Sequence, residues 1–134
     1  MMIVAIASQV RAQLLAEAAA ALPAECCGLL LGSAGRVEAL VPAANVAADP
    51  AHNFEIDPAT LLRTHREARG AGHEVIGHYH SHPHGRAEPS WRDAARAVAN
   101  GQLWLIIGAG RITGWQAGAT GMHGCFQPVV LEAA

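Results

Sequence analysis

The sequence predicts an α/β sandwich in which helices flank a mixed or mainly antiparallel sheet. Two observations support this fold class: helical segments are interleaved with hairpin-like strand pairs, and Gly or Pro residues separate the segments. A length of 134 residues is within the usual size of one domain. Residues 1–134 are therefore expected to form a single domain around one core.

The first elements follow from apolar runs and helix signals. Residues 2–7 are predicted to form a strand, and Ser8 can cap a helix that runs through an Ala/Leu-rich segment to about residue 22. Pro23 would end that helix because proline cannot continue it. Residues 26–31 are continuously apolar up to a glycine, as expected for a strand buried on both faces.

The middle of the chain contains a hairpin partner and a second helix. Residues 36–41 are predicted to pair with the preceding strand, and residues 52–56 are predicted to form another strand. Asp57 followed by Pro58 has the order of a helix cap and a first helical residue. We expect this helix to run to about Arg69, before two glycines.

The last elements surround a loop rich in His and Pro. Residues 74–80 are predicted to form a strand, and residues 81–89 a loop, since this segment contains two prolines and a glycine. Ser90 can cap a helix that runs to about Ala99. Three further strands are predicted at residues 102–108, 111–117 and 126–131.

The composition is that of a globular protein. The chain has 51% hydrophobic residues, 15% charged residues and a net charge of −2, so neither a nucleic-acid partner nor a membrane partner is expected. All nine basic residues are Arg, which excludes Schiff-base chemistry and the lysine-containing phosphate loop.

The cysteines and the N-terminal segment indicate the cellular compartment in which the protein is expected. Cys26, Cys27 and Cys125 give no disulfide framework and no zinc-finger spacing, as expected in a reducing compartment. The first residues lack a basic leader, and Arg11 interrupts the apolar run. No apolar run reaches the roughly eighteen residues of a membrane span, and a cytoplasmic protein is predicted.

Residues 77–93 contain the candidate metal-ligating residues. Because strand side chains alternate between faces, His80 and His82 project to the same side, about 6–7 Å apart along the backbone. The following loop could return the chain so that Asp93, in the first turn of the next helix, supplies a third ligand. Two imidazoles and one carboxylate suit Zn²⁺ and leave a fourth position for water, which is typical of a catalytic site.

Simpler interpretations of this segment exist. A His-rich loop can be a solvated segment, or its histidines can form a hydrogen-bonded core pair, but the spacing of Asp93 favours a metal site. His78 has the same strand parity and is expected to pack behind the ligands, while His84 is expected to be exposed. Either could be a spare ligand. The remaining histidines show no ligand spacing: His52, His65, His73 and His123.

A water activated by a metal also needs a proton acceptor. Glu74 lies on the same strand as His80, but six residues of strand place it about 20 Å away. Glu88 lies in the loop, so the direction of its side chain cannot be deduced, and Glu25 stands directly before a buried strand. On the residues alone, Glu25 and Glu88 are equal candidates.

These residues resemble the JAMM (MPN+) metallopeptidases. The pattern of that family is a Glu in an upstream strand, then His-Ser-His-Pro, then Pro-Ser-x-x-Asp. In this chain Glu25 stands in the upstream position, and residues 80–83 and 89–93 match the other two parts. The resemblance implies the cytidine-deaminase-like α/β sandwich of the MPN domain.

The resemblance also implies roles. His80, His82 and Asp93 would bind one Zn²⁺, Glu25 would activate the water and pass its proton to the leaving amine, and Ser90 would stabilise the oxyanion. Ser90 could also serve only as a helix cap. The adjacent cysteines would be buried core residues of the upstream strand.

The substrate expectation comes from the same resemblance. The chain is similar to compact prokaryotic JAMM proteins, so it is expected to hydrolyse a peptide or isopeptide bond at the Gly-Gly tail of a ubiquitin-like or sulfur-carrier protein. Two alternatives stay open: an Fe(II) enzyme, because two His and one carboxylate also bind iron, and a non-catalytic binding module stiffened by its metal. The sequence leaves the oligomeric state open.

Overall fold

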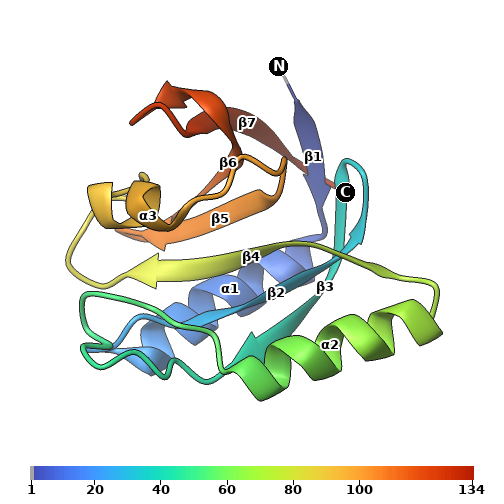
Figure 1. Cartoon of the computed structure of the whole chain (residues 1–134), viewed down its shortest axis with the longest axis horizontal. Helices are drawn as coiled ribbons and strands as arrows, with labels where there is room; N and C mark the ends of the chain where they lie inside the picture. The colour runs from blue at the N-terminus through green and yellow to red at the C-terminus, as the bar shows by residue number, and fades with distance from the viewer. Residues whose placement is uncertain (1) are drawn as a thin grey trace.

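The computed structural model describes residues 2–134 and contains seven strands and three helices (Figure 1). The strands close into a barrel in the order β1-β3-β2-β4-β5-β6-β7. The elements in chain order are β1 (Ile3–Ile6), α1 (Ser8–Ala21), β2 (Cys27–Ser33), β3 (Arg36–Ala43), α2 (Pro58–Gly70), β4 (Glu74–His82), α3 (Trp91–Arg96), β5 (Leu103–Gly108), β6 (Arg111–Met122) and β7 (Phe126–Ala133).

The predicted mixed sheet with helices around it is confirmed. Strand pairs β1–β3, β1–β7 and β4–β5 are parallel, and β2–β3, β2–β4, β5–β6 and β6–β7 are antiparallel. The sheet differs from an open sandwich in that it closes, because β1 pairs with β3 on one side and with β7 on the other. Closure leaves neither end strand with an unpaired edge there.

Two of the three predicted helix caps are present. Asp57 accepts a hydrogen bond from Ala59 N, with proline in the first turn of α2, and Ser90 caps α3. The prediction that Ser8 caps the first helix is wrong: Ser8 is already helical, and Ala7 precedes it without a side-chain cap. Helix α3 also ends at Arg96, earlier than predicted, because Ala97 already has extended backbone angles.

Two strand predictions need correction. The strand predicted to end at His80 continues to His82, because Ser81 and His82 pair with Ile107 and Gly108 of β5. The strand predicted at residues 52–56 is not formed; this segment makes one isolated bridge, between Asn45 and Ile56. Side chains, rather than a β-ladder, hold that segment in place, as described below.

The core has two parts, and the second supports the site. One apolar cluster joins the barrel interior to α1 through residues such as Val4, Leu14 and Leu105. The other includes Phe54, Trp104, Ile106 and Phe126, and it lies beside the C-terminal half of β4. In Figure 1 the end of β4, helix α3 and the loop between β3 and α2 lie at the same end of the molecule.

Among residues 2–134, the structure has no helix with the length and apolar character that crossing a bilayer requires.

Candidate active site

The end of β4 brings His80 and His82 together. Both side chains leave the same side of the strand, as their two-residue spacing predicts, and their Nε2 atoms lie 3.0 Å apart. His80 is fully buried and stacks on the ring of Phe54, with ring centroids 4.3 Å apart. His82, the last residue of β4, is half-buried and faces the surface cleft.

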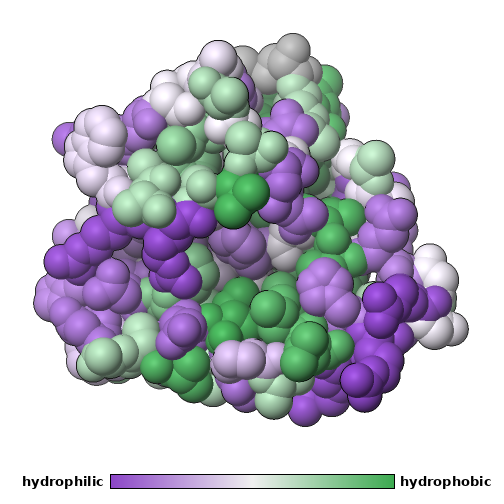
Figure 2. Space-filling model, viewed as in Figure 1, coloured by the Kyte–Doolittle hydropathy of each residue, from purple (hydrophilic) through white to green (hydrophobic). Residues whose placement is uncertain are grey.

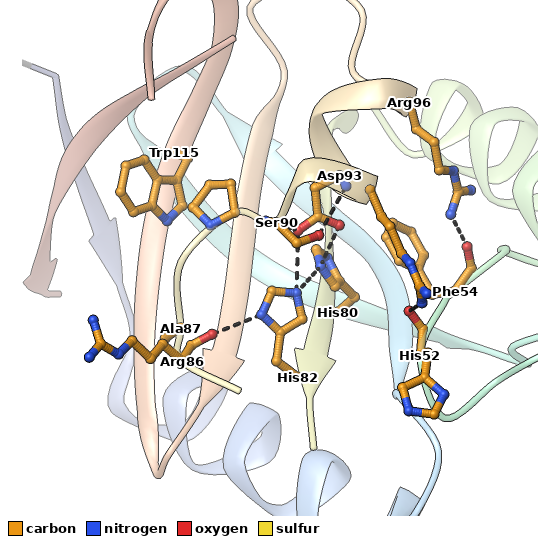
Figure 3. Close-up of polar contacts among 12 residues, drawn as sticks. His52, Phe54, His80, His82, Arg86, Ala87, Ser90, Asp93, Arg96 and Trp115 are labelled. Atoms are coloured by element: carbon orange, nitrogen blue, oxygen red, sulfur yellow. Dashed lines mark hydrogen bonds and ion pairs between the residues drawn. The ribbon is translucent and has the colours of Figure 1, made fainter. Parts of the chain in front are cut away.

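Helix α3 supplies the third side chain of the cluster. Asp93 Oδ1 lies 3.1 Å from His80 Nε2, and Asp93 Oδ2 lies 3.3 Å from His82 Nε2 (Figure 3). The predicted return of the chain after the His-Pro loop therefore occurs. The ligand-type atoms of His80, His82 and Asp93 all lie within 4.8 Å of one another.

The start of α3 is a capping box. Ser90 Oγ accepts a hydrogen bond from Asp93 N at 3.1 Å, and the Ser90 N–H donates to Asp93 Oδ2 at 2.9 Å. This reciprocal pair satisfies free N–H groups of the first helical turn and fixes the Asp93 carboxylate toward the histidines. The cap is therefore also the device that orients Asp93.

The loop after β4 orients His82. Its Nδ1 lies 2.8 Å from the carbonyl oxygen of Arg86, so neutral His82 carries its proton on Nδ1 and presents a lone pair on Nε2. The Arg86 carbonyl is itself held in place, because the backbone of residues 86–87 packs directly against Gly108 of β5. A Cβ atom at Gly108 would lie 2.7 Å from Ala87 N.

The donor set fits a metal ion. Two ligand atoms bound at about 2.1 Å to a tetrahedral ion lie roughly 3.4 Å apart. The two imidazole Nε2 atoms lie 3.0 Å apart, and each lies 3.1–3.3 Å from one of the two Asp93 carboxylate oxygens, which is close to this value. The groups are two imidazole nitrogens and one carboxylate, a combination that binds divalent transition metals.

The protonation states follow from burial and pairing. Burial disfavours a charged Asp93, but hydrogen bonds from His80 and His82 outweigh it and hold the pKa of Asp93 well below its usual range. Burial lowers the pKa of His80. Burial also acts against a charged His82, yet its contacts with Asp93 and the Arg86 carbonyl raise the pKa of His82 above its ordinary 6.5.

Glu25 lies in the same cleft as the cluster. The cleft has a volume of about 510 Å³, and Glu25, His82, Ser90 and Asp93 all contribute to its lining. Glu25 is only 6% exposed, and burial raises its pKa to about 7, although His82 nearby acts in the opposite direction. A carboxyl group with this pKa can both accept and release a proton near neutral pH.

The structure distinguishes Glu25 from the other two candidate proton acceptors. Glu88 also lines the cleft, but it is exposed and its Oε1 lies 4.0 Å from Arg86 Nη1. Glu74 is exposed at the opposite end of β4, as predicted. Of the two equal candidates, only Glu25 combines burial with a place in the cleft.

The spare histidines and cysteines lie where they were predicted. His78 packs edge-on against Trp104, with ring centroids 4.3 Å apart, and His84 is exposed. Cys26 and Cys27 are buried, and burial raises both pKa values, that of Cys27 to about 12, so both stay protonated thiols. None of the four belongs to the cluster.

The sequence did not predict the side chains that hold the loop between β3 and α2 beside the cleft. Asn45 Nδ2 donates to the carbonyl of Glu25 at 3.0 Å and to that of Asn53 at 2.9 Å. From α3, Arg92 donates to the carbonyl of His52 and Arg96 to that of Phe54 (Figure 3). The four-residue spacing of the two arginines was visible on a predicted helix, but nothing in the sequence indicated their acceptors.

The surface around the cleft is strongly hydrophilic. In the space-filling view, hydrophilic side chains gather next to α3, whereas an apolar area lies toward α2 (Figure 2). Arg86, Arg92 and Arg96 all line the cleft, together with the exposed His52 and His84. A polar or charged partner segment can therefore approach the buried cluster from this side.

Comparisons with known proteins agree with this geometry. The chain matches the family model for prokaryotic homologs of the JAB domain over residues 7–118. It is 40% identical over 94 residues to a desampylase of Haloferax volcanii, which covers 68% of each chain. It is 38% identical over 89 residues to a probable TtuB-protein conjugate cleaving protease of Thermus thermophilus, covering 66% of this chain and 57% of that relative.

Solved structures share the whole fold. Protein DSY2949 of Desulfitobacterium hafniense has a TM-score of 0.80 at 27% identity, covering 98% of this chain and 94% of that chain. AF2198, a JAB1/MPN domain protein of Archaeoglobus fulgidus, has a TM-score of 0.59 at 19% identity and covers 96% of both chains, a likeness of fold. The chain therefore belongs to the prokaryotic JAB-domain family and is a compact member of the JAMM/MPN metallopeptidases.

Proposed function

We propose that this chain is a zinc-dependent hydrolase of peptide or isopeptide bonds, and that His80, His82 and Asp93 hold the metal. The observation that carries the proposal is the convergence of these three side chains, two of which, His82 and Asp93, line a surface cleft. A neutral imidazole pair with one carboxylate leaves room for further ligands on Zn²⁺. When bound, zinc supplies Lewis-acid chemistry, since it lowers the pKa of a water and polarises a carbonyl oxygen.

Glu25 is the proton carrier in this proposal. Its buried carboxyl group, with a pKa of about 7 in the metal-free protein, accepts a proton from the attacking water and passes it to the leaving amine. The backbone on both sides of the side chain is held: Glu25 N donates to the Pro50 carbonyl at 2.7 Å, and Glu25 O accepts from Asn45. This anchoring keeps the carboxyl group at the cleft.

Ser90 can serve as cap and as oxyanion donor at once. Its Oγ accepts the hydrogen bond from Asp93 N through a lone pair, so the hydroxyl hydrogen is still available to donate. Ser90 lines the cleft beside the metal cluster. We assign its hydroxyl to stabilise the negative charge that develops on the carbonyl oxygen of the scissile bond.

For the substrate, we propose a ubiquitin-like or sulfur-carrier protein joined through its C-terminal Gly-Gly tail. The support comes from the relatives: a desampylase and a probable TtuB-protein conjugate cleaving protease are both similar to this chain. A cleft that is open at the surface accepts an extended tail more readily than a folded segment.

The test is a cleavage assay with a defined product. A small ubiquitin-like carrier extended beyond its Gly-Gly tail is incubated with the zinc-loaded protein, and the products are weighed by mass spectrometry. We expect a carrier that ends in Gly-Gly, and no product after chelation of the metal. Turnover that depends on iron and oxygen, or cleavage of unrelated peptides alone, would contradict the proposal.

Substitution of Glu25 provides a second test of the proposed function. Glu25→Gln should leave zinc bound while lowering turnover by about 10²-fold or more, because the amide cannot accept the proton. Glu88→Gln is the matched control, since Glu88 lies in the same cleft but is exposed. Unchanged turnover in Glu25→Gln would remove the catalytic assignment, and loss of zinc would make Glu25 a ligand.

A further inference from the structure

An exposed tryptophan stands at the rim of the cleft. Trp91 is 72% exposed, while the other two tryptophans, Trp104 and Trp115, are 4% and 8% exposed. Trp91 is the first residue of α3, between Ser90 and Arg92, and it contributes to the lining of the cleft. Tryptophan is enriched at interfaces because its ring offers a large apolar contact area and its N–H a polar one.

The imidazole ring of His123 supports the indole of Trp91. The ring of His123 lies against it, with ring centroids 3.9 Å apart and planes inclined by 40°. His123 Nε2 lies 2.9 Å from the carbonyl oxygen of Pro89, two residues before Trp91. His123 also has a φ of 55°, a backbone conformation that few residues other than glycine adopt.

This support matters for binding. A side chain that is already ordered loses little conformational entropy when a partner covers it, so a pre-oriented aromatic face binds more tightly than a mobile one. Although the ring of His123 lies against the indole, Trp91 remains 72% exposed. The rim thus offers a supported apolar face beside the charged side chains of Arg92 and Arg96.

We propose that Trp91, positioned by His123, is the platform on which the substrate's Gly-Gly tail lies extended as it enters the cleft. This inference rests on the proposed function and names the residue that selects the tail. Two extended residues span about 7 Å, comparable with the long dimension of an indole. Because glycine has no Cβ, both peptide planes can lie flat on the ring, whereas a side chain pointing at the ring would lift the backbone.

The location of the indole agrees with that role. Trp91 directly precedes Arg92 and lies two positions before Asp93. Trp91, His82 and Asp93 line the same cleft, so a tail that crosses the indole enters the cleft that holds the candidate ligands. Glu25 lines the same cleft. The residue is therefore assigned to specificity, with no part in the proton transfer.

Fluorescence quenching tests the contact directly. Because Trp104 and Trp115 are buried, acrylamide in the surrounding water quenches mainly Trp91. The probe is the peptide Ala-Ala-Ala-Gly-Gly joined through its carboxyl end to a lysine Nε, and the protein is zinc-loaded Glu25→Gln, so that the probe stays intact. We expect the probe to protect the indole from quenching, and the Trp91→Phe protein to show neither the quenched signal nor its protection.

Kinetics on the active protein test the selection. Trp91→Ala should raise KM for the Gly-Gly probe about tenfold with little change in kcat, as expected for loss of an aromatic contact. The preference for Gly-Gly over an Ala-Ala probe should fall by a similar factor. Trp91→Phe should keep most of the preference, and Leu62→Ala, which removes an equally exposed apolar side chain on α2, should change neither value.

The outcomes separate the two proposals. If the Gly-Gly probe is cleaved but Trp91 is not protected, or if Trp91→Ala slows both probes equally and keeps their ratio, the platform is wrong while the hydrolase proposal stands. If Trp91 is protected but no Gly-Gly probe is cleaved, the platform stands and the hydrolase proposal fails.

Discussion

At the scale of single residues, Ser90 combines two tasks that can be separated by substitution. Its oxygen caps α3 and fixes Asp93, and its hydrogen is assigned to the oxyanion. Replacing an N-cap serine with alanine costs about 1 kcal/mol, whereas replacing it with glycine costs only a few tenths. Loss of one oxyanion donor lowers kcat about 10²–10³-fold.

We therefore predict that Ser90→Gly and Ser90→Ala lose similar turnover but differ in stability. Urea unfolding of the metal-free proteins should show about 1 kcal/mol of destabilisation for Ser90→Ala and less for Ser90→Gly. Ser90→Thr keeps the hydroxyl and should keep most of the turnover. If kcat instead followed stability across the three variants, Ser90 would be a cap alone.

At the scale of elements, the side chain of Asn45 makes hydrogen bonds that organise the loop between β3 and α2. Asn45 Oδ1 accepts hydrogen bonds from Ala47 N and Glu55 N, both at 3.1 Å, while its Nδ2 holds the carbonyls of Glu25 and Asn53. Arg92 and Arg96 tie the same loop to α3. The loop thus links the proposed proton carrier to the helix that carries Asp93.

Asn45→Ala should loosen this link. We expect a loss of about 1–3 kcal/mol in unfolding free energy, because carbonyls in the loop lose their donor, and a fall in kcat because Glu25 is no longer held. Asn45→Asp keeps the acceptor oxygen and loses the donor, so it should also lower kcat. Urea denaturation together with steady-state kinetics measures both effects. Full kcat in both variants would mean that the loop does not position Glu25.

At the scale of the whole molecule, the sequence predicted features that depend on neighbouring residues better than features that depend on contacts between distant residues. The period of two along residues 80–82 predicted that the histidines converge, and the capping signal at Ser90 placed Asp93 correctly. The closed barrel depends on pairing between β1 and β7, which lie at opposite ends of the chain and carry no sequence signal for each other. Non-local pairing of this kind could not be deduced from periodicity.

The wrong strand at residues 52–56 has a similar cause. Phe54 and Ile56 alternate with polar residues, a pattern typical of a half-buried strand. In the structure, the segment is instead held by side-chain contacts with its backbone from Asn45, Arg92 and Arg96. The support of Trp91 by His123 likewise joins α3 to the β6–β7 turn. Such contacts need the folded arrangement before they can be recognised.

The proposed metal site depends on the charge states of its three side chains. Asp93 has a lowered pKa and is ionised, and His80 has a lowered pKa and is neutral near pH 7. His82 has a raised pKa, so in the metal-free protein it is the ligand that holds a proton as the pH falls. Because a metal binds only the neutral imidazole, binding must displace that proton.

Isothermal titration of zinc into the metal-free protein, repeated from about pH 8 to pH 5.5, tests this claim most directly. We predict one zinc per chain, with an affinity that is nearly constant above the pKa of His82 and falls about tenfold per pH unit below it. Asp93→Ala should weaken binding strongly at every pH. Undiminished zinc binding in Asp93→Ala, or no stoichiometric binding to the natural sequence, would contradict the account.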